Sequence, residues 1–281
     1  MKVGIIGAGS VGSTTAFALI MRGVARKVVL IDANEKKAQA EAMDIAHATP
    51  FAYANKVKAG TYEDLKGCEI VIVTAGANQK PGETRIDLLG RNVKIFESII
   101  PQITQAAPDT TLIITSNPAD IMTEVALKLS GFPKERVIGS GTVLDTARFR
   151  TLLGYHLGVS PQSIHANVIG EHGDSEVLVW SAGDAGTVSL DKLAEEFGKP
   201  FTPEVKAQID DCVRNAAYKI IDGKGATFYG IAGALCRICS AITTKNKRFS
   251  TSRPTMMTSK ASKTFAFRCR LYWANAAFIT S

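Results

Sequence analysis

The chain has 281 residues, of which 46% are hydrophobic, so it can bury the core of one large or two modest domains, and no apolar run reaches the roughly 18 residues of a membrane-spanning helix. Its formal net charge of +7 would suit a nucleic-acid-binding protein, because clustered lysine and arginine release counterions from phosphate backbones. Residues 242–281 carry this charge, with eight basic and no acidic residues against 25 basic and 26 acidic ones in the rest, so we expect neither nucleic acid nor a membrane as a partner.

The first half of the chain alternates short apolar runs with longer stretches of helical period. Its first residues lead directly into a strand rather than a signal peptide, which predicts a cytoplasmic protein. Near-continuous apolar strands separated by helices are typical of a parallel sheet covered on both faces. We therefore predict a doubly wound α/β domain of the Rossmann type over residues 1–142, with strands at 3–6, 28–31, 70–74, 112–115 and 137–138 and helices at 10–21, 35–47, 86–105 and 119–129.

The rhythm of the sequence changes after about residue 142. No internal repeat and no Pro- or Gly-rich linker separates the two halves, so we expect them to share a packed interface. The second half predicts a mixed α+β substrate domain over residues 143–281, with a helix at 144–157, a strand at 164–169, amphipathic helices at 203–221 and 229–243, and an atypical tail at 242–281.

The cysteines indicate reduced thiols rather than a disulfide framework, because their number is odd and their spacing irregular. Cys236 and Cys239 form a single C-x-x-C within the apolar helix predicted at 229–243, with no second pair of ligands nearby. A packed helix is therefore favoured over a zinc or redox site, and no metal is expected. The five cysteines are Cys68, Cys212, Cys236, Cys239 and Cys269.

A glycine-rich turn lies between the first strand and the first helix, at residues 7–12 (GAGSVG). Glycines at such a turn let the backbone approach a pyrophosphate, whose charge the helix N-terminus stabilises. Asp32 ends the second strand, where a carboxylate accepts hydrogen bonds from the ribose hydroxyls and repels a 2′-phosphate. A purely structural turn is the alternative, but the strand, helix and acid together favour NAD, bound by Gly7, Gly9, Val11, Gly12 and Asp32.

A candidate catalytic group follows the strand at 164–169, where His172 stands in the segment GEHGDS. Asp145 and Arg148 are three residues apart on a predicted helix and share one face of it. Asp145 could orient the imidazole of His172, and Arg148, on the same helix face, could bind the carboxylate of a substrate. A structural histidine and a surface ion pair are the alternatives.

Together with the glycine turn, these motifs resemble the lactate and malate dehydrogenase superfamily from residue 1 to about residue 240. The resemblance implies that His172 protonates the carbonyl of pyruvate as hydride arrives, and accepts the proton in the reverse direction. It implies that Asp145 fixes the tautomer of His172 and stabilises the imidazolium. Arg148 would bind the substrate carboxylate through two parallel hydrogen bonds.

The resemblance also assigns the polar segment 76–85 (GANQKPGETR) to a loop that closes over the substrate. Arg85 would then polarise the reacting carbonyl. Asn117 would hydrogen-bond near the carbonyl or the nicotinamide, and Thr227 would line the substrate pocket.

Gln79 in this loop bears on the substrate, because malate-specific relatives have an arginine at the matching position. A neutral amide suits the methyl end of pyruvate, whereas the second carboxylate of oxaloacetate needs a cation. The resemblance therefore implies an L-lactate dehydrogenase that interconverts pyruvate and L-lactate. A malate dehydrogenase, or a dehydrogenase of another 2-hydroxy acid, is the alternative.

Arg150 and His165 match the pair that binds fructose 1,6-bisphosphate across a subunit interface in many bacterial members of the superfamily. The resemblance implies an allosteric homotetramer in which both side chains bind phosphate groups. Both could equally be ordinary surface residues.

From about Thr244 the sequence no longer resembles the superfamily. A disordered basic tail is the simplest interpretation. A sharper hypothesis is that the tail is translated in a shifted reading frame. In the shifted frame, each new codon consists of the third base of one codon and the first two bases of the next. The genetic code then requires Asp from Met256/Met257, Asp from Met257/Thr258 and Gly from Trp273/Ala274. The other codons permit the string STYDDDFQGIKDICFSLPAVLG, which the superfamily usually carries, and the coding DNA decides the matter.

Two further interpretations follow from this tail. A frameshifted product could be an inactive enzyme that still binds NAD through its first domain. A nucleic-acid-binding protein would instead lose its binding when residues 242–281 are deleted, whatever the dehydrogenase motifs do.

Overall fold

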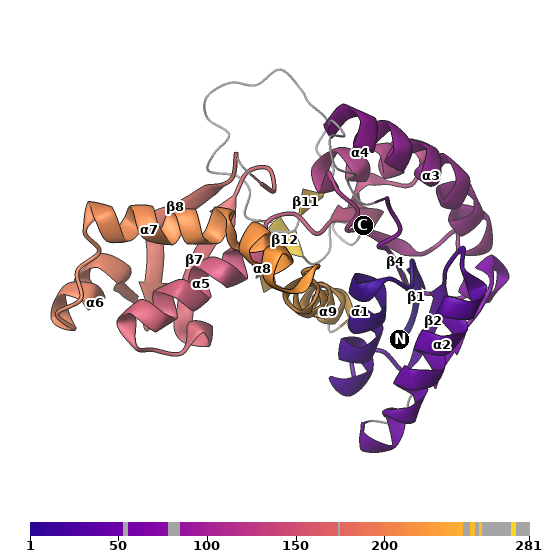
Figure 1. The fold of residues 1–281 in the computed structure, drawn as a ribbon, viewed down its shortest axis with the longest axis horizontal. Coiled ribbons are helices and arrows are strands. Elements are labelled where there is room, and N and C mark those ends of the chain that lie inside the picture. The colour runs from indigo at the N-terminus through magenta and orange to yellow at the C-terminus, as the bar shows by residue number, and fades with distance from the viewer. Residues whose placement is uncertain are drawn as a thin grey trace, which may run out of the picture.

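The computed structural model describes residues 1–52, 56–77, 85–173 and 175–243, and beyond them the backbone of three short strands (Figure 1). These strands are β10 (Arg248–Ser250), β11 (Arg253–Pro254) and β12 (Leu271–Trp273). The chain forms two lobes, of which the first holds the N-terminal sheet and the second lies around helices α5 to α8. Among the described residues, no helix is both long and apolar enough to cross a membrane.

A twisted sheet of mainly parallel strands forms the centre of the first lobe. Its order is β11-β6-β5-β4-β1-β2-β3, and only β11 runs antiparallel to its neighbour β6. The direction of winding reverses between β1 and β4, which creates the crevice where ligands of doubly wound folds bind. The predicted Rossmann-type sheet is confirmed, with the predicted strands observed as β1 (Lys2–Ile6), β2 (Lys27–Ile31), β4 (Ile70–Val73), β5 (Thr111–Ile114) and β6 (Val137–Gly139). The strand β3 (Lys56–Ala59), at the edge of the sheet, was not predicted.

Helices cover both faces of this sheet because the central strands β1, β4 and β5 carry apolar side chains on both faces. One face packs against α1 (Ser10–Met21), α2 (Glu35–His47) and α9 (Tyr229–Thr243), and the other against α3 (Arg85–Ala106) and α4 (Ala119–Ser130). The central strands β1 and β4 are buried, from Val3 at one end to Val73 at the other.

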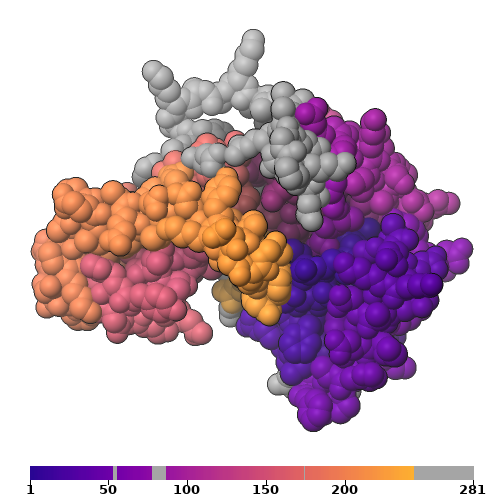
Figure 2. Space-filling view, in the orientation of Figure 1, coloured from indigo at the N-terminus to yellow at the C-terminus, as the bar shows by residue number. Residues whose placement is uncertain are grey.

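Helix α9 joins the two lobes, although its sequence falls in the half of the chain predicted as the second domain. It lies along α1, and Figure 2 shows the orange end of the described chain meeting the indigo first lobe. Cys236 and Cys239 lie in the core that α9 shares with α1 and the sheet, and burial raises the pKa of both thiols. A packed thiol of this kind disfavours the thiolate that metal binding or redox chemistry needs.

The second lobe has its own apolar core, in which Phe149, Leu153 and Val168 are fully buried. The helix predicted at 203–221 divides at Asn215, which ends α7 and begins α8. The lobe also contains two strands and a helix that the sequence did not predict, β8, β9 and α6. The elements of this lobe are α5 (Val143–Leu157), β7 (Ile164–Ile169), β8 (Val177–Ala185), β9 (Val188–Ser189), α6 (Leu190–Glu196), α7 (Pro203–Arg214) and α8 (Ala216–Lys224). Over both lobes, the described residues also form short 3₁₀ helices at Thr49–Phe51, Tyr62–Leu65, Lys134–Arg136 and Pro161–Ser163.

Gly12 should tolerate no side chain, because a Cβ added there would lie 1.9 Å from the carbonyl oxygen of Gly7. We expect Gly12→Ala to lower the melting temperature by roughly 5 °C or more, since α1 must move away from the turn. Gly9→Ala is the matched control, because an added Cβ there meets nothing within 4 Å. Thermal unfolding followed by circular dichroism measures both, and equal melting temperatures would contradict the close approach.

Candidate active site

The glycine turn lies at the reversal point of the sheet, where β1 ends and α1 begins. Gly7 has a positive φ of 104°, and the hydroxyl of Thr74, at the end of β4, donates a hydrogen bond of 2.9 Å to its carbonyl oxygen. Gly9 is the N-cap of α1 and offers no capping side chain. Val11 is partly buried against the core, so its side chain anchors the first turn of α1. The turn thus exposes backbone N–H groups at the positive end of a helix dipole.

Asp32 lies directly after β2 and beside the glycine turn. Its Oδ2 accepts a hydrogen bond of 2.7 Å from the backbone N–H of Ala8, and its Oδ1 accepts one of 2.8 Å from Asn34. Each carboxylate oxygen keeps a further lone pair for a hydroxyl group. Together with the open space at Gly9, this arrangement fits NAD, whose pyrophosphate would lie on the turn and whose ribose would bind Asp32.

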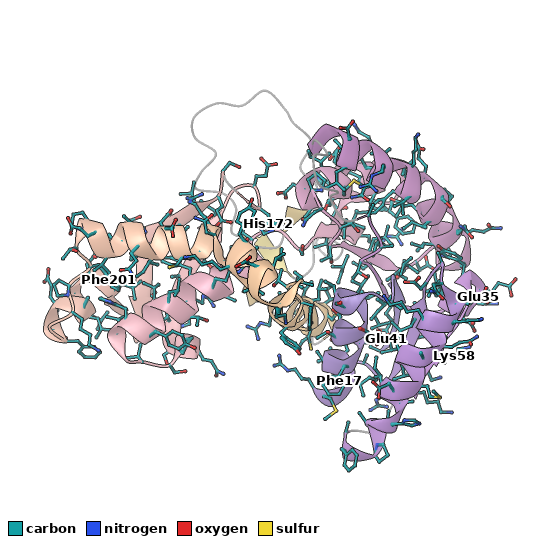
Figure 3. All side chains as sticks on the ribbon, in the orientation of Figure 1. Phe17, Glu35, Glu41, Lys58, His172 and Phe201 are labelled. Carbon is teal, nitrogen blue, oxygen red and sulfur yellow. The ribbon has the colours of Figure 1, made fainter. Side chains whose placement is uncertain are left out.

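Asp145 lies at the centre of the candidate catalytic group, with a side chain that is 1% exposed. It stands in the first turn of α5, and its two oxygens have different partners. Oδ2 lies 2.6 Å from Nδ1 of His172, which follows β7, while Oδ1 accepts a hydrogen bond of 2.9 Å from the guanidinium of Arg148. The structure therefore brings together His172, Asp145 and Arg148, and Figure 3 places His172 between the two lobes.

The hydrogen bond to Asp145 raises the pKa of His172 above its ordinary value, and burial opposes this shift. Because Nδ1 is engaged with Asp145, Nε2 is left to exchange a proton with a substrate. The imidazole of His172 and the guanidinium of Arg148 are both half-buried. In this arrangement the arginine can bind the carboxylate of a 2-oxo acid while the protonated imidazole donates its proton to the neighbouring carbonyl.

Two acidic residues near His172 were missed in the sequence. Oδ2 of Asp120, in the first turn of α4, accepts a hydrogen bond of 2.9 Å from the backbone N–H of His172. Asp120 comes three residues after Asn117, and the proline at 118 could have indicated that a helix begins there. Glu176 is 3% exposed, and burial, followed by the charge of Asp145, raises its pKa to about 7.

Asp145, His172 and Glu176 bring their ligand atoms within 4.8 Å of one another, a spacing that could in principle hold a metal ion. The 2.6 Å contact between His172 and Asp145 is too short for both to bind one cation without moving apart. The guanidinium of Arg148 already neutralises Asp145. The cluster therefore suits proton transfer better than metal binding.

The remaining candidate residues lie at several places around this group. Asn117 follows β5, and its carbonyl oxygen accepts a hydrogen bond of 2.7 Å from the side chain of Asn92. Thr227 is half-buried in the connection between α8 and α9. Arg85 is the first residue of α3, but its side chain lies outside the described part of the structure, and Gln79 lies outside the described residues altogether.

Arg150 and His165 lie on neighbouring elements, α5 and β7. Nε of Arg150 donates a hydrogen bond of 2.8 Å to the carbonyl oxygen of Ala166, and a terminal nitrogen donates one of 3.2 Å to the side chain of Asn167. Burial, followed by the charge of Arg237, lowers the pKa of Arg150. His165 is exposed, whereas Arg150 is half-buried.

Comparison with known proteins places this geometry in one family. The model for the NAD-binding domain of lactate/malate dehydrogenases matches residues 1–139, and the model for the α/β C-terminal domain matches residues 142–273. The chain belongs to the lactate/malate dehydrogenase family. Its dinucleotide cofactor is accordingly NAD, as the glycine turn and Asp32 predict.

Similar proteins in this family are named L-lactate dehydrogenases. The enzyme of Thermus aquaticus is 58% identical over 247 residues, which cover 88% of this chain and 80% of that protein, and the enzyme of Deinococcus radiodurans is 51% identical over 242 residues, 86% and 79% of the two. The ligand-bound minor L-lactate dehydrogenase of Enterococcus mundtii superposes with a TM-score of 0.86 at 41% identity, covering 89% of this chain and 80% of that one. These relatives favour the lactate interpretation over malate.

Replacing Asp145 by Asn should lower the pKa of His172, because the replacement removes the hydrogen-bonded negative charge that raises it. If His172 is the proton donor, pyruvate reduction needs its imidazolium, which is fully present below the pKa of His172 and is lost as the pH rises through it. We therefore expect the rate of Asp145→Asn to decline at a pH about one unit lower, with a maximum roughly 100-fold reduced. The pH profile of kcat/KM for pyruvate measures this.

Asp191→Asn provides the control for this experiment. Asp191 pairs with Lys206 at 2.9 Å on an exposed surface, so its replacement removes one carboxylate of an ion pair without touching His172. A profile shifted equally in both variants would argue against a specific role of Asp145.

Proposed function

We propose that this chain catalyses the reversible reduction of pyruvate to L-lactate by NADH. The observation that carries this proposal is the Asp145 carboxylate, which joins His172 to Arg148 at 2.6 and 2.9 Å. The similarity to several L-lactate dehydrogenases supports the substrate. Residues 1–142 would bind NAD and residues 143–281 the substrate, and an NADH-linked reaction of this kind fits a cytoplasmic location.

His172 acts as the proton donor in this proposal. With Nδ1 held by Asp145, Nε2 carries the proton that passes to the carbonyl oxygen of pyruvate, while the electron pair of the N–H bond stays on the ring. NADH, when bound, supplies the hydride that the carbonyl carbon receives. In the reverse direction the neutral imidazole removes the hydroxyl proton of lactate.

Arg148 binds the substrate carboxylate. One of its terminal nitrogens contacts Asp145, so its other N–H groups remain to form two parallel hydrogen bonds with a carboxylate. Arg85 would polarise the reacting carbonyl, Asn117 would bind near it, and Gln79 and Thr227 would line the methyl end of the pocket.

A homotetramer activated by fructose 1,6-bisphosphate belongs to the same proposal. Large apolar side chains are exposed on the first lobe, among them Phe17 at 44%, Met43 at 61% and Tyr229 at 70%. Phe17, Tyr229 and Glu41 line a surface hollow of about 280 Å³ between α1, α2 and α9. Figure 3 labels Phe17 on α1 and Glu41 on α2. Burial of such a face in a subunit contact would remove it from water. Arg150 and His165 would bind the phosphates.

The purified chain should oxidise NADH when pyruvate is added, which the absorbance of the nicotinamide measures. We expect kcat/KM for pyruvate to exceed that for oxaloacetate by about tenfold or more.

The His172→Ala variant should lose several orders of magnitude in turnover and keep its affinity for NADH. Measuring the rate and the sedimentation coefficient with and without fructose 1,6-bisphosphate tests the activator and the tetramer. Turnover of oxaloacetate in preference to pyruvate would overturn the proposal.

Gln79→Arg should move the preference toward oxaloacetate, since a cation at this position pairs with the second carboxylate of that substrate. We expect the ratio of the two kcat/KM values to change by about tenfold or more in favour of oxaloacetate. Gln102→Arg, at an exposed position of α3, adds the same charge elsewhere and should leave the ratio unchanged. An equal change in both variants would mean that general electrostatics and not the pocket decide the preference.

A further inference from the structure

Glu176 is a buried acid for which the proposed reaction has no use. It lies immediately before β8, its side chain is among the buried polar groups at 3% exposure, and its Oε1 is buried without a hydrogen-bond partner among the described residues. An unpartnered carboxylate oxygen is costly to bury, so its position beside His172 calls for an explanation.

The surroundings of Glu176 contain charges of both signs. A carboxylate oxygen of Glu176 lies within 4.8 Å of both the Asp145 carboxylate and the His172 ring. Arg148 is bound to Asp145, the charge of Arg214 on α7 also acts on Glu176, and the backbone of Gly173 contributes a hydrogen bond to it. Asp120 faces the same loop through the backbone of His172.

The charge of Arg148 balances that of Asp145, and the charge of Arg214 is balanced by Asp210, with which it forms an ion pair. Asp120 meets the backbone N–H of His172 and not its ring. Among the described residues, Glu176 and the His172 ring remain as the two titratable groups of this cluster without a partner of opposite charge other than each other and Asp145. The pair is neutral when it holds one proton, either as carboxylate with imidazolium or as carboxylic acid with imidazole. Buried groups resist a net charge, so the addition of a second proton or the removal of the only one is disfavoured.

We propose that Glu176 is a positioning residue that shares one proton with His172 and, when ionised, stabilises the imidazolium that donates to the substrate. This inference rests on the proposed function and deepens it. When the imidazolium has given its proton to the carbonyl oxygen, the N–H electron pair remains on the ring and the Glu176 carboxylate is left unbalanced. That charge favours the uptake of the next proton from water. The two charges act on each other in the expected directions: the charge of Glu176 raises the pKa of His172, and the charge of His172 lowers the pKa of Glu176, against the larger upward effects of burial and of Asp145.

A purely structural role is the competing explanation. The backbone N–H of Glu176 donates a hydrogen bond of 3.1 Å to the carbonyl oxygen of Gly173, so the residue also helps to form the turn after His172. In that case, replacing the side chain would change stability but not the titration of His172.

The test is the pKa of His172 in the chain without ligands, measured by NMR with ¹³C-labelled histidine. The chain has only four histidines, and His172→Gln identifies the signal. We expect Glu176→Gln to lower the pKa of His172 by about one unit, because the neutral amide removes a charge that raises it. Glu176→Asp should keep part of the shift, since it keeps the charge. Glu171→Gln, an exposed acid of the same loop, should change nothing.

The wild-type chain provides a second measurement that needs no folded variant. If the two groups share a proton, the His172 signal should titrate in two steps, whereas an uncoupled histidine gives one. A single step, or an unchanged pKa in a folded Glu176→Gln, would overturn the inference. If pyruvate is not turned over but His172 titrates in two steps, the proposed substrate is wrong, whereas the proposed sharing of a proton between Glu176 and His172 is supported. In an active enzyme, the decline of kcat with pH should shift by the same amount as the pKa.

Discussion

The buried carboxylate of Asp145 is the interaction on which the active site depends. A carboxylate that is 1% exposed is stable only when its charge is compensated, and both compensating groups, Arg148 and His172, are those that a 2-hydroxy acid would meet. Arg148 comes from the same helix three residues later, whereas His172 comes from the loop after β7. The charge that binds α5 to this loop is therefore also the charge that raises the pKa of the imidazole.

The position of the site follows from how the two lobes meet. The glycine turn and Asp32 lie at the carboxyl ends of β1 and β2, next to the point between β1 and β4 where the sheet reverses its winding. Asp120, in the first turn of α4, binds the backbone of His172, so the first lobe holds the catalytic loop of the second directly. Helix α9 makes a second connection, because it follows Thr227 and packs on α1. A cofactor bound at the glycine turn would thus be held by the first lobe and a substrate bound at Arg148 by the second, and the contacts of Asp120 and of α9 connect these two lobes.

The sequence was informative where a single local rule decides the structure. The glycine turn and Asp32 could be predicted because turn, helix and strand end follow one another within 26 residues, counted from Gly7 to Asp32. The spacing of Asp145 and Arg148 predicted a shared helix face for the same reason. Asp120 and Glu176 were missed for different reasons. Asp120 meets His172 only through the packing of α4 against the loop. Glu176 is only four residues from His172, but no local rule indicates that its carboxylate is buried beside the ring. The break at Asn215 was missed because the apolar periodicity continues across it.

Helix α8 shows why the tail matters to the site. Among the described residues it has no buried member, and Tyr218, Ile220 and Ile221 are 60%, 37% and 46% exposed. A helix with an apolar face normally packs that face against another element. The pairwise similarity to the relatives spans 241 to 247 residues, about as far as the end of α9 at Thr243, although the family model continues to residue 273. A shifted reading frame would restore two acids and a glycine in this stretch. Because Thr227 comes three residues after the end of α8, an element that packed on α8 would also restrict the position of Thr227 beside the proposed substrate pocket.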